Sequence, residues 1–148
     1  MKIAIGSDHA GYAAKEHLKL WLAEHKHEVV DVGTDGTVSV DYPDFAARVG
    51  RLVAQSAAPL GLLICGSGIG MSIAANKIPG IRAAHCTDCY QARVARQHND
   101  ANVLCLGARV SGFGVMEDTL ESFLGHTFDG GRHAARVAKI VNLDRSPS

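Results

Sequence analysis

Residues 60–77 hold the side chains and spacing best suited to chemistry in this chain of 148 residues. A short apolar run ends on Cys65, and three glycines alternate with two other residues over positions 66–70 before an apolar, helix-like stretch. This pattern predicts a buried strand, a tight turn and the start of a helix. Such a turn directs backbone N–H groups at an anion and favours the thiolate form of a nearby cysteine. Cys65 is therefore a candidate base or nucleophile, although small thiols are also common in buried strands.

The glycine loop at 66–70 differs from the standard nucleotide-binding motifs. A Walker loop ends in Gly-Lys-Ser/Thr, which is missing here, and the dinucleotide fingerprint G-x-G-x-x-G usually follows the first strand. These differences disfavour nucleotide binding. A nucleotide-binding module stays as an alternative that predicts affinity for ATP.

Asp8 and His9 follow the first predicted strand, and Arg109 follows the fifth. An Asp-His pair at a strand end is equally consistent with a helix cap and with a catalytic group. Because the carboxyl ends of parallel strands share one edge of a sheet, all three side chains are expected near Cys65.

Two further groups lie near predicted helix ends. Arg132 and Arg136 are four residues apart after a Gly-Gly pair, so they share a helix face. That face suits a phosphate, but the pattern alone slightly favours a solvated basic stripe. His98 and Asn99 close an earlier helix, where a histidine can simply complement the helix dipole.

Cys86 and Cys89 form a Cys-x-x-Cys pair that resembles half of a zinc or redox site. Zinc would need two more ligands at matching spacing, and the sequence has no second pair. The pair also follows the fourth predicted strand, which is unlike a thioredoxin arrangement. Both functions are disfavoured.

The elements that must position these residues alternate along the whole chain. The strands are expected at residues 2–7, 28–32, 60–65, 81–85 and 102–106, and the helices at 10–25, 43–57, 70–76, 88–98, 111–125 and 132–143. Thr87 or Asp88 is expected to cap the fourth of these helices, and Ser111 the fifth. Repeated βα units predict an α/β fold.

We expect one Rossmann-like domain over residues 1–148, a three-layer sandwich with a five-stranded parallel sheet in the order 2-1-3-4-5. In that order the winding direction changes between strands one and three. A ligand crevice is expected at the carboxyl ends of these two strands, where Asp8, His9 and the Cys65 loop converge.

Composition excludes several classes of function. Apolar residues make up 47% and charged residues 20% of the chain, which is typical of a folded globular protein. Fifteen basic residues balance fifteen acidic ones, so neither nucleic acid nor an anionic membrane is an expected partner. No apolar run approaches the roughly 18–20 residues needed to cross a bilayer. The start lacks a signal-peptide pattern, and four cysteines in apolar or helical settings suggest reduced thiols in the cytoplasm.

Six motifs together resemble the type B ribose-5-phosphate isomerases of the ribose/galactose isomerase family. They occur in the family's order, and the likeness covers nearly the whole chain, from residue 2 to about residue 141. They are Gly6-Ser7-Asp8-His9-Ala10-Gly11, Asp41-Tyr42-Pro43-Asp44, Cys65-Gly66-Ser67-Gly68-Ile69-Gly70, Ala74-Ala75-Asn76-Lys77, Arg96-Gln97-His98-Asn99-Asp100 and Gly130-Gly131-Arg132-His133.

The resemblance implies an aldose–ketose isomerase that interconverts D-ribose 5-phosphate and D-ribulose 5-phosphate through an enediolate, in the non-oxidative pentose phosphate pathway. It implies no metal and no cofactor. Cys65 would be the base and His98 the acid that opens the sugar ring, with Ser67 also in the catalytic set. The implied substrate-binding residues are Asp8, His9, Gly66, Ser67, Gly68, Ile69, Gly70, Asn99, Arg109, Arg132 and Arg136.

The family also implies a homodimer, which can pair into a tetramer, with a site shared between subunits. One branch of the family carries a glutamate base just after the glycine loop, where this chain has Met71, so Cys65 keeps the role of base. Two alternatives stay open: a hexose-6-phosphate isomerase acting on allose or galactose 6-phosphate, and a phosphosugar-binding regulator without catalysis.

Overall fold

The structure, a computed structural model, describes residues 1–144, so residues 145–148 of the expected domain lie outside the described part. Its strands are β1 (Lys2–Ser7), β2 (Glu28–Asp31), β3 (Leu60–Cys65), β4 (Ala83–His85) and β5 (Val103–Gly107). Its helices are α1 (Tyr12–Glu24), α2 (Tyr42–Ala54), α3 (Ile69–Ala75), α4 (Cys89–Asn99), α5 (Phe113–Leu124) and α6 (Ala134–Leu143), the last preceded by a short 3-10 turn, η1 (Gly131–His133).

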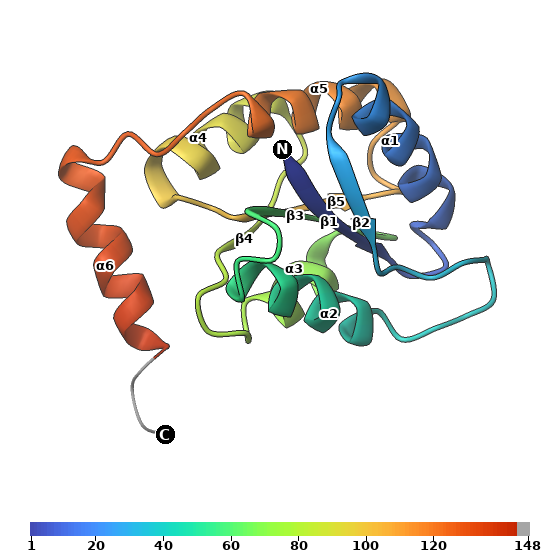
Figure 1. Cartoon of the computed structure of the whole chain (residues 1–148), viewed down its shortest axis with the longest axis horizontal. Coiled ribbons are helices and arrows are strands. Elements are labelled where there is room, and N and C mark those ends of the chain that lie inside the picture. The colour runs from blue at the N-terminus through green and yellow to red at the C-terminus, as the bar shows by residue number, and fades with distance from the viewer. Residues whose placement is uncertain (145–148) are drawn as a thin grey trace.

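The five strands form one parallel sheet covered on both faces, which confirms the predicted α/β fold. Helices α2 and α3 cover one face, and α1, α4 and α5 cover the other (Figure 1). The layers follow from repeated βα units, because each crossover helix must bury its apolar side against the sheet. Helix α6 lies apart from these layers, beyond the β4 edge of the sheet (Figure 1).

The strand order is β2-β1-β3-β5-β4, so the predicted order 2-1-3-4-5 is wrong at one edge. Strand β5 is buried at all five positions and lies beside β3, whereas β4 has three half-buried residues and lies at the edge. The physical reason is burial, because a continuous apolar strand stabilises the centre of a sheet while a short, more polar strand tolerates an open side. The change of winding between β1 and β3 is as expected.

Strand β3 contributes alternately to the two cores. Leu62 and Ile64 pack with the helices α1, α4 and α5, while Leu63 and Cys65 pack with α2 and α3. Successive strand side chains point to opposite faces, so the last residue of β3 lies in the α2/α3 layer. This register places the Cys65 side chain below the start of α3.

The helix ends follow the expected capping in part. Asp88 caps α4, since its Oδ1 accepts the Gln91 N–H at 2.8 Å, and the Gln91 side chain in turn accepts the Thr87 N–H at 2.9 Å. The predicted Ser111 cap of α5 is wrong, because Gly112 holds the N-cap position without a side-chain bond. Within residues 1–144, no helix combines the length and the apolar character needed to cross a membrane.

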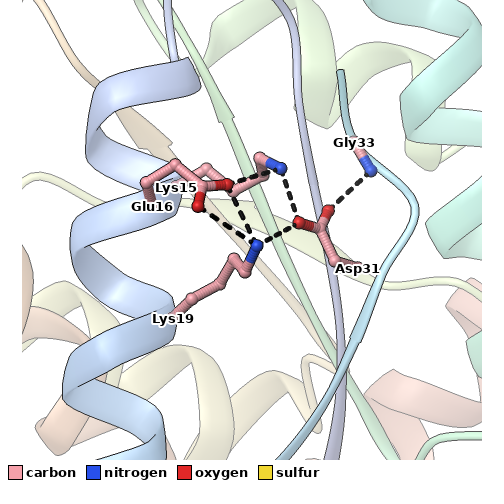
Figure 2. Close-up of polar contacts among 5 residues, drawn as sticks. All are labelled: Lys15, Glu16, Lys19, Asp31 and Gly33. Carbon is pink, nitrogen blue, oxygen red and sulfur yellow. Dashed lines mark hydrogen bonds and ion pairs between the residues drawn. The ribbon is translucent and has the colours of Figure 1, made fainter. Parts of the chain in front are cut away.

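A charged cluster around the buried Lys15 joins α1 to the end of β2. The Lys15 ammonium, 2% exposed, contacts the carboxylates of Asp31 and Glu16, and Lys19 pairs with both acids as well (Figure 2). Burial raises the pKa of Asp31, but hydrogen bonds from Lys15 and Lys19 outweigh it and bring the pKa below its ordinary value. The same two lysines lower the pKa of Glu16. This cluster satisfies a lysine that would otherwise be costly to bury.

Asp31→Asn should destabilise the fold, because it leaves the buried Lys15 ammonium with one carboxylate fewer. We expect the free energy of unfolding at pH 7 to fall by about 3 kcal/mol. Since folding lowers the pKa of Asp31, its contribution is complete above the unfolded value of about 3.9 and is lost as the pH falls through the lower folded value. Urea unfolding of both proteins at pH 7 and below about pH 3 should show this difference shrink.

The matched control is Glu28→Gln, because Glu28 pairs with Lys2 at 3.3 Å on the surface. An exposed ion pair contributes less than about 1 kcal/mol, so the free energy of unfolding of this variant should stay close to that of the wild type. Equal losses in the two variants would contradict the stabilising role of the cluster around Lys15.

Candidate active site

A pocket of about 380 Å³ lies at the carboxyl ends of β1 and β3, with walls from the glycine loop and the segment after β5. Seven of the predicted site residues line it: Asp8, His9, Cys65, Gly66, Ser67, Gly70 and Arg109. They come together because the carboxyl ends of adjacent parallel strands open on the same side of the sheet. A thiol, a carboxylate, an imidazole and a guanidinium therefore surround one cavity.

The Cys65 sulfur accepts a hydrogen bond from the Gly68 N–H at 3.1 Å. Cys65 is 5% exposed, and it belongs both to the α2/α3 core and to the lining of the pocket, so it lies at the boundary between the two. The bond needs a tight turn, and Gly68 supplies it with a φ of +80°, which residues with a side chain rarely adopt. An N–H directed at sulfur stabilises developing negative charge on it.

Close packing holds the glycine loop in place. A Cβ at Gly68 would lie 2.5 Å from the His85 ring, and one at Gly70 would lie 2.7 Å from the ring of Tyr42. The rings of His85 and Tyr42 thus occupy the space that these two side chains would need. The loop is a rigid part of the pocket, as a preorganised site requires.

Arg109 reaches the pocket from the end of β5. Its N–H donates to the Gly66 carbonyl at 2.9 Å, and the next residue back, Ala108, donates to the Cys65 carbonyl at 2.8 Å. A Cβ at Gly66 would lie 3.4 Å from a guanidinium nitrogen of Arg109. Arg109 is thus the positive charge beside the thiol loop.

Asp8 and His9 are both held by backbone N–H groups. Asp8 is buried, and its Oδ1 accepts the Gly11 N–H at 3.0 Å ahead of α1. Asp8 therefore lies in the pocket, whereas the helix-cap interpretation is wrong, because Gly11 holds the N-cap position of α1 and no side chain of the described residues caps that helix. His9 Nδ1 accepts the Val40 N–H at 3.2 Å, which leaves Nε2 for a ligand.

Two loop residues predicted to bind substrate are directed elsewhere. The Gly68 N–H is engaged with Cys65, and the Ile69 N–H donates to Ser67 Oγ at 3.3 Å. Neither Gly68 nor Ile69 is among the pocket-lining residues, and the Ile69 side chain is 53% exposed. In this chain their amides organise the thiol and the Ser67 hydroxyl.

His98, Asn99, Arg132 and Arg136 are not among the residues that line this pocket. Helix α4 begins at the edge of the sheet where the strands have their carboxyl ends, and it runs back toward the opposite edge, so His98 and Asn99 lie there. The next residue, Asp100, lines a cavity together with Met1, which precedes β1 at that opposite edge.

The His98 ring stacks on His133 with centroids 4.2 Å apart, and Arg132 Nε lies 3.5 Å from His133 Nε2. Burial lowers the pKa of His133, and the neighbouring His98, Arg132 and Arg136 lower it further. Arg132 lies in the 3-10 turn and Arg136 in α6, so only one of the two arginines belongs to the helix expected for both. These residues form a second, basic group that is separate from the thiol pocket.

Tyr42, Ala10 and Val110 also line the pocket, and sequence reasoning assigned no role to them. Tyr42 begins α2, and its ring packs on Gly70. Their positions in the sequence could have indicated that they line the pocket, because Tyr42 belongs to one of the six motifs. Ala10 and Val110 each adjoin a predicted site residue.

The other thiols differ from Cys65. Burial raises the pKa of Cys86 to about 12, with Asp88 adding to the effect, and burial raises the pKa of Cys105 well above its ordinary value. Both thiols stay protonated near neutral pH. Cys89 is exposed at the start of α4, and all four cysteines, which lie within the described residues, are free.

In this doubly wound α/β fold, acid–base side chains surround a pocket where the winding direction changes between β1 and β3. This arrangement is typical of an enzyme that acts on small, polar molecules. The comparisons with known proteins are more specific. The model of the Ribose/Galactose Isomerase family matches residues 3–140. Ribose-5-phosphate isomerase B of Escherichia coli K12 is 44% identical over 144 residues, 97% of each chain.

Solved structures agree with these sequence matches. Ribose-5-phosphate isomerase B of Clostridium thermocellum is 51% identical with a TM-score of 0.97, covering 98% of each chain. The type B ribose 5-phosphate isomerase of Trypanosoma cruzi is 46% identical with a TM-score of 0.95, covering 99% of this chain and 100% of that one. The chain belongs to the ribose/galactose isomerase family and is an isomerase, which confirms the resemblance found in its motifs.

Gly68→Ala should weaken the hydrogen bond from the backbone N–H of residue 68 to the Cys65 sulfur. An alanine at a φ of +80° costs about 1–2 kcal/mol, and its Cβ would collide with His85, so the loop must move. We expect Cys65 to react about tenfold more slowly with iodoacetamide at pH 7, because the sulfur loses its N–H donor. Mass spectrometry separates this reaction from that of the exposed Cys89.

Gly36→Ala is the control, since a Cβ there meets nothing within 4 Å. It should leave the reactivity of Cys65 unchanged. An unchanged rate in Gly68→Ala would mean that the N–H···S bond does not govern the thiol.

Proposed function

We propose that this isomerase interconverts D-ribose 5-phosphate and D-ribulose 5-phosphate through an enediolate, with the whole chain acting as one cytoplasmic catalytic domain of the pentose phosphate pathway. The observation that carries the proposal is the Cys65 sulfur in the pocket wall, bonded to the Gly68 N–H. The names of the relatives from E. coli and C. thermocellum support the substrate.

Cys65 is assigned as the base. A C–H beside a carbonyl is only weakly acidic, so the base must be ionised and placed within reach of both C1 and C2. One thiolate on a short rigid turn meets that need, because it removes a proton from one carbon and returns it to the other. The Gly68 N–H supports this role by stabilising negative charge on the sulfur.

The enediolate oxygens are assigned to amides of the glycine loop. Since the Gly68 and Ile69 amides are already engaged, the amides of Ser67 and Gly70 are the candidates. The Gly70 N–H lies in the first turn of α3, where helix amides have no partner within the helix. Donors aimed at a developing oxyanion are usually the largest catalytic contribution, about 3–4 kcal/mol for each one lost. Asp8 is assigned to a sugar hydroxyl.

Phosphate binding is assigned to His9 and Arg109 from this chain and to Arg132 and Arg136 from a second copy. Guanidinium groups form charge-assisted bonds to phosphate oxygens and thereby align the reacting carbons over the thiol. Because the two groups of residues lie at different edges of one chain, a complete site needs a partner subunit.

A homodimer would bring the two groups together, with His98 as the ring-opening acid and Asn99 beside it. Helix α6 supports this proposal, since it lies apart from the layers of its own chain (Figure 1). Val137 is the buried residue of this helix. Its apolar Ile140 and Leu143 are 42% and 72% exposed, as expected of a helix that packs on another copy. Pairing of dimers into a tetramer would be a further step.

Cys65→Ala should lower kcat for ribose 5-phosphate by about 10²–10⁴-fold, the range of a general base. Binding of ribose 5-phosphate, measured by calorimetry, should change little because the phosphate and hydroxyl contacts are intact. Cys86→Ala is the matched control and should keep nearly full activity, because Cys86 lies in the core on the opposite face of the sheet. Turnover by Cys65→Ala at the wild-type rate would contradict the role of base.

The six-carbon alternative is tested with allose 6-phosphate and galactose 6-phosphate in the same assay. We expect a higher kcat/KM for ribose 5-phosphate. A higher value for a six-carbon sugar would assign the chain to the hexose-6-phosphate isomerases instead, and binding without turnover of any of these sugars would contradict the isomerisation itself.

Mixing Cys65→Ala with His98→Asn should restore activity if the site is shared. A mixed dimer has one site with both substitutions and one site with neither, so random exchange at equal amounts should recover about one quarter of the wild-type activity. The mixture is unfolded, refolded together and assayed, with each variant refolded alone as the control. No recovery, from a mixture shown to contain mixed dimers, would mean that Cys65 and His98 act within one chain.

A further inference from the structure

His9, the histidine that lines the pocket, accepts a hydrogen bond from a segment outside the pocket, the one that joins β2 to α2 (residues 32–41). The Val40 N–H donates to His9 Nδ1 at 3.2 Å. A nitrogen that accepts this bond carries no proton, so the neutral ring is protonated at Nε2. Because His9 lines the pocket, its Nε2–H is the donor that remains for a ligand.

The start of the same segment is held by Asp31. Asp31 Oδ1 accepts the Gly33 N–H at 2.9 Å, and the following Thr34 N–H donates to the Ser7 carbonyl at 3.0 Å. Gly33 lies directly on the charged cluster, since a Cβ there would be 2.8 Å from the Lys15 side chain and 2.7 Å from the Ser7 nitrogen. The backbone can approach this closely only at glycine.

Asp31 is itself held by two lysines of α1. Its Oδ2 lies 2.7 Å from Lys19 Nζ and also contacts the Lys15 ammonium, while Oδ1 faces Gly33 (Figure 2). One carboxylate thus joins a buried cation to the base of the segment. At the other end, Val40 packs on the α2/α3 core, so the segment is held on both sides of its exposed turn.

We propose that Asp31 is a positioning residue for His9. It holds the 32–41 segment against α1 so that the Val40 N–H keeps the His9 ring in the Nε2–H form, with the donor facing the pocket. A phosphate or hydroxyl oxygen of the phosphosugar then meets a donor whose tautomer and direction are already set. The ligand class rests on the proposed function, whereas the state of His9 in the ligand-free protein does not.

The test is nitrogen NMR of the ring of His9 in ¹⁵N-labelled, ligand-free protein above the ordinary histidine pKa of about 6.5. Wild type should show one tautomer, protonated at Nε2. Asp31→Asn should show averaging between the two tautomers, because the Val40 N–H no longer stays on Nδ1. A wild-type ring protonated at Nδ1 would overturn the proposal, as would an Asp31→Asn spectrum identical to wild type.

Glu16→Gln is the matched control, since Glu16 contacts Lys15 and Lys19 but makes no bond to Gly33 (Figure 2). It removes the same charge from the cluster and should leave the His9 tautomer unchanged. Averaging of equal size in this variant would assign the effect to the cluster's stability and overturn a specific role for Asp31.

Gly33→Ala tests the same connection if Asp31→Asn does not fold. It keeps every charge and displaces the start of the 32–41 segment, so the Val40 N–H should also lose its hydrogen bond to His9 Nδ1. A folded Gly33→Ala protein with the wild-type His9 spectrum would overturn the proposal.

Kinetics provide the second measurement. His9 would contact a group that is the same in substrate and transition state, so its release should raise KM for ribose 5-phosphate about tenfold with kcat nearly unchanged. A fall in kcat at constant KM would contradict this role. If wild type does not turn over ribose 5-phosphate, the proposed function fails, while the NMR result still decides the positioning role.

Discussion

The hydrogen bond from the Gly68 N–H to the Cys65 sulfur is the interaction on which the candidate site depends. It links the end of β3 to the N-cap residue of α3, three residues further on, and it exists because Gly68 adopts a positive φ. The neighbouring rings of His85 and Tyr42 leave no room for larger residues in the loop. A thiol in the pocket wall and a rigid amide beside it make general-base chemistry possible without any movement of the loop.

The sheet explains why the remaining groups gather around this thiol. Strands β1, β3 and β5 are neighbours, so the residues that follow them (Asp8, the glycine loop and Arg109) open on one pocket. The same geometry separates His98 from that pocket, because a crossover helix that starts at the carboxyl edge ends at the other. A second copy of the chain is therefore part of the proposed site.

Most of the fold could be predicted from the sequence, because alternating apolar and glycine-rich segments mark the βα units. The positions of β4 and β5 could not, since both orders satisfy the pattern of elements and only the greater burial of β5 decides between them. The pocket residues next to strand ends were predictable for the same reason. Sequence could not show that the Gly68 amide faces the sulfur, nor that Lys15 and Asp31 meet, because both depend on side-chain and backbone directions in space.

The most direct test of the central claim is to follow ribose 5-phosphate turnover in deuterated water by NMR. A thiolate that removes and returns a proton exchanges with solvent, so the account predicts deuterium at the carbon that receives the proton. Replacing Cys65 with serine should abolish this incorporation. Deuterium incorporation or turnover that persists unchanged in Cys65→Ser would contradict the account.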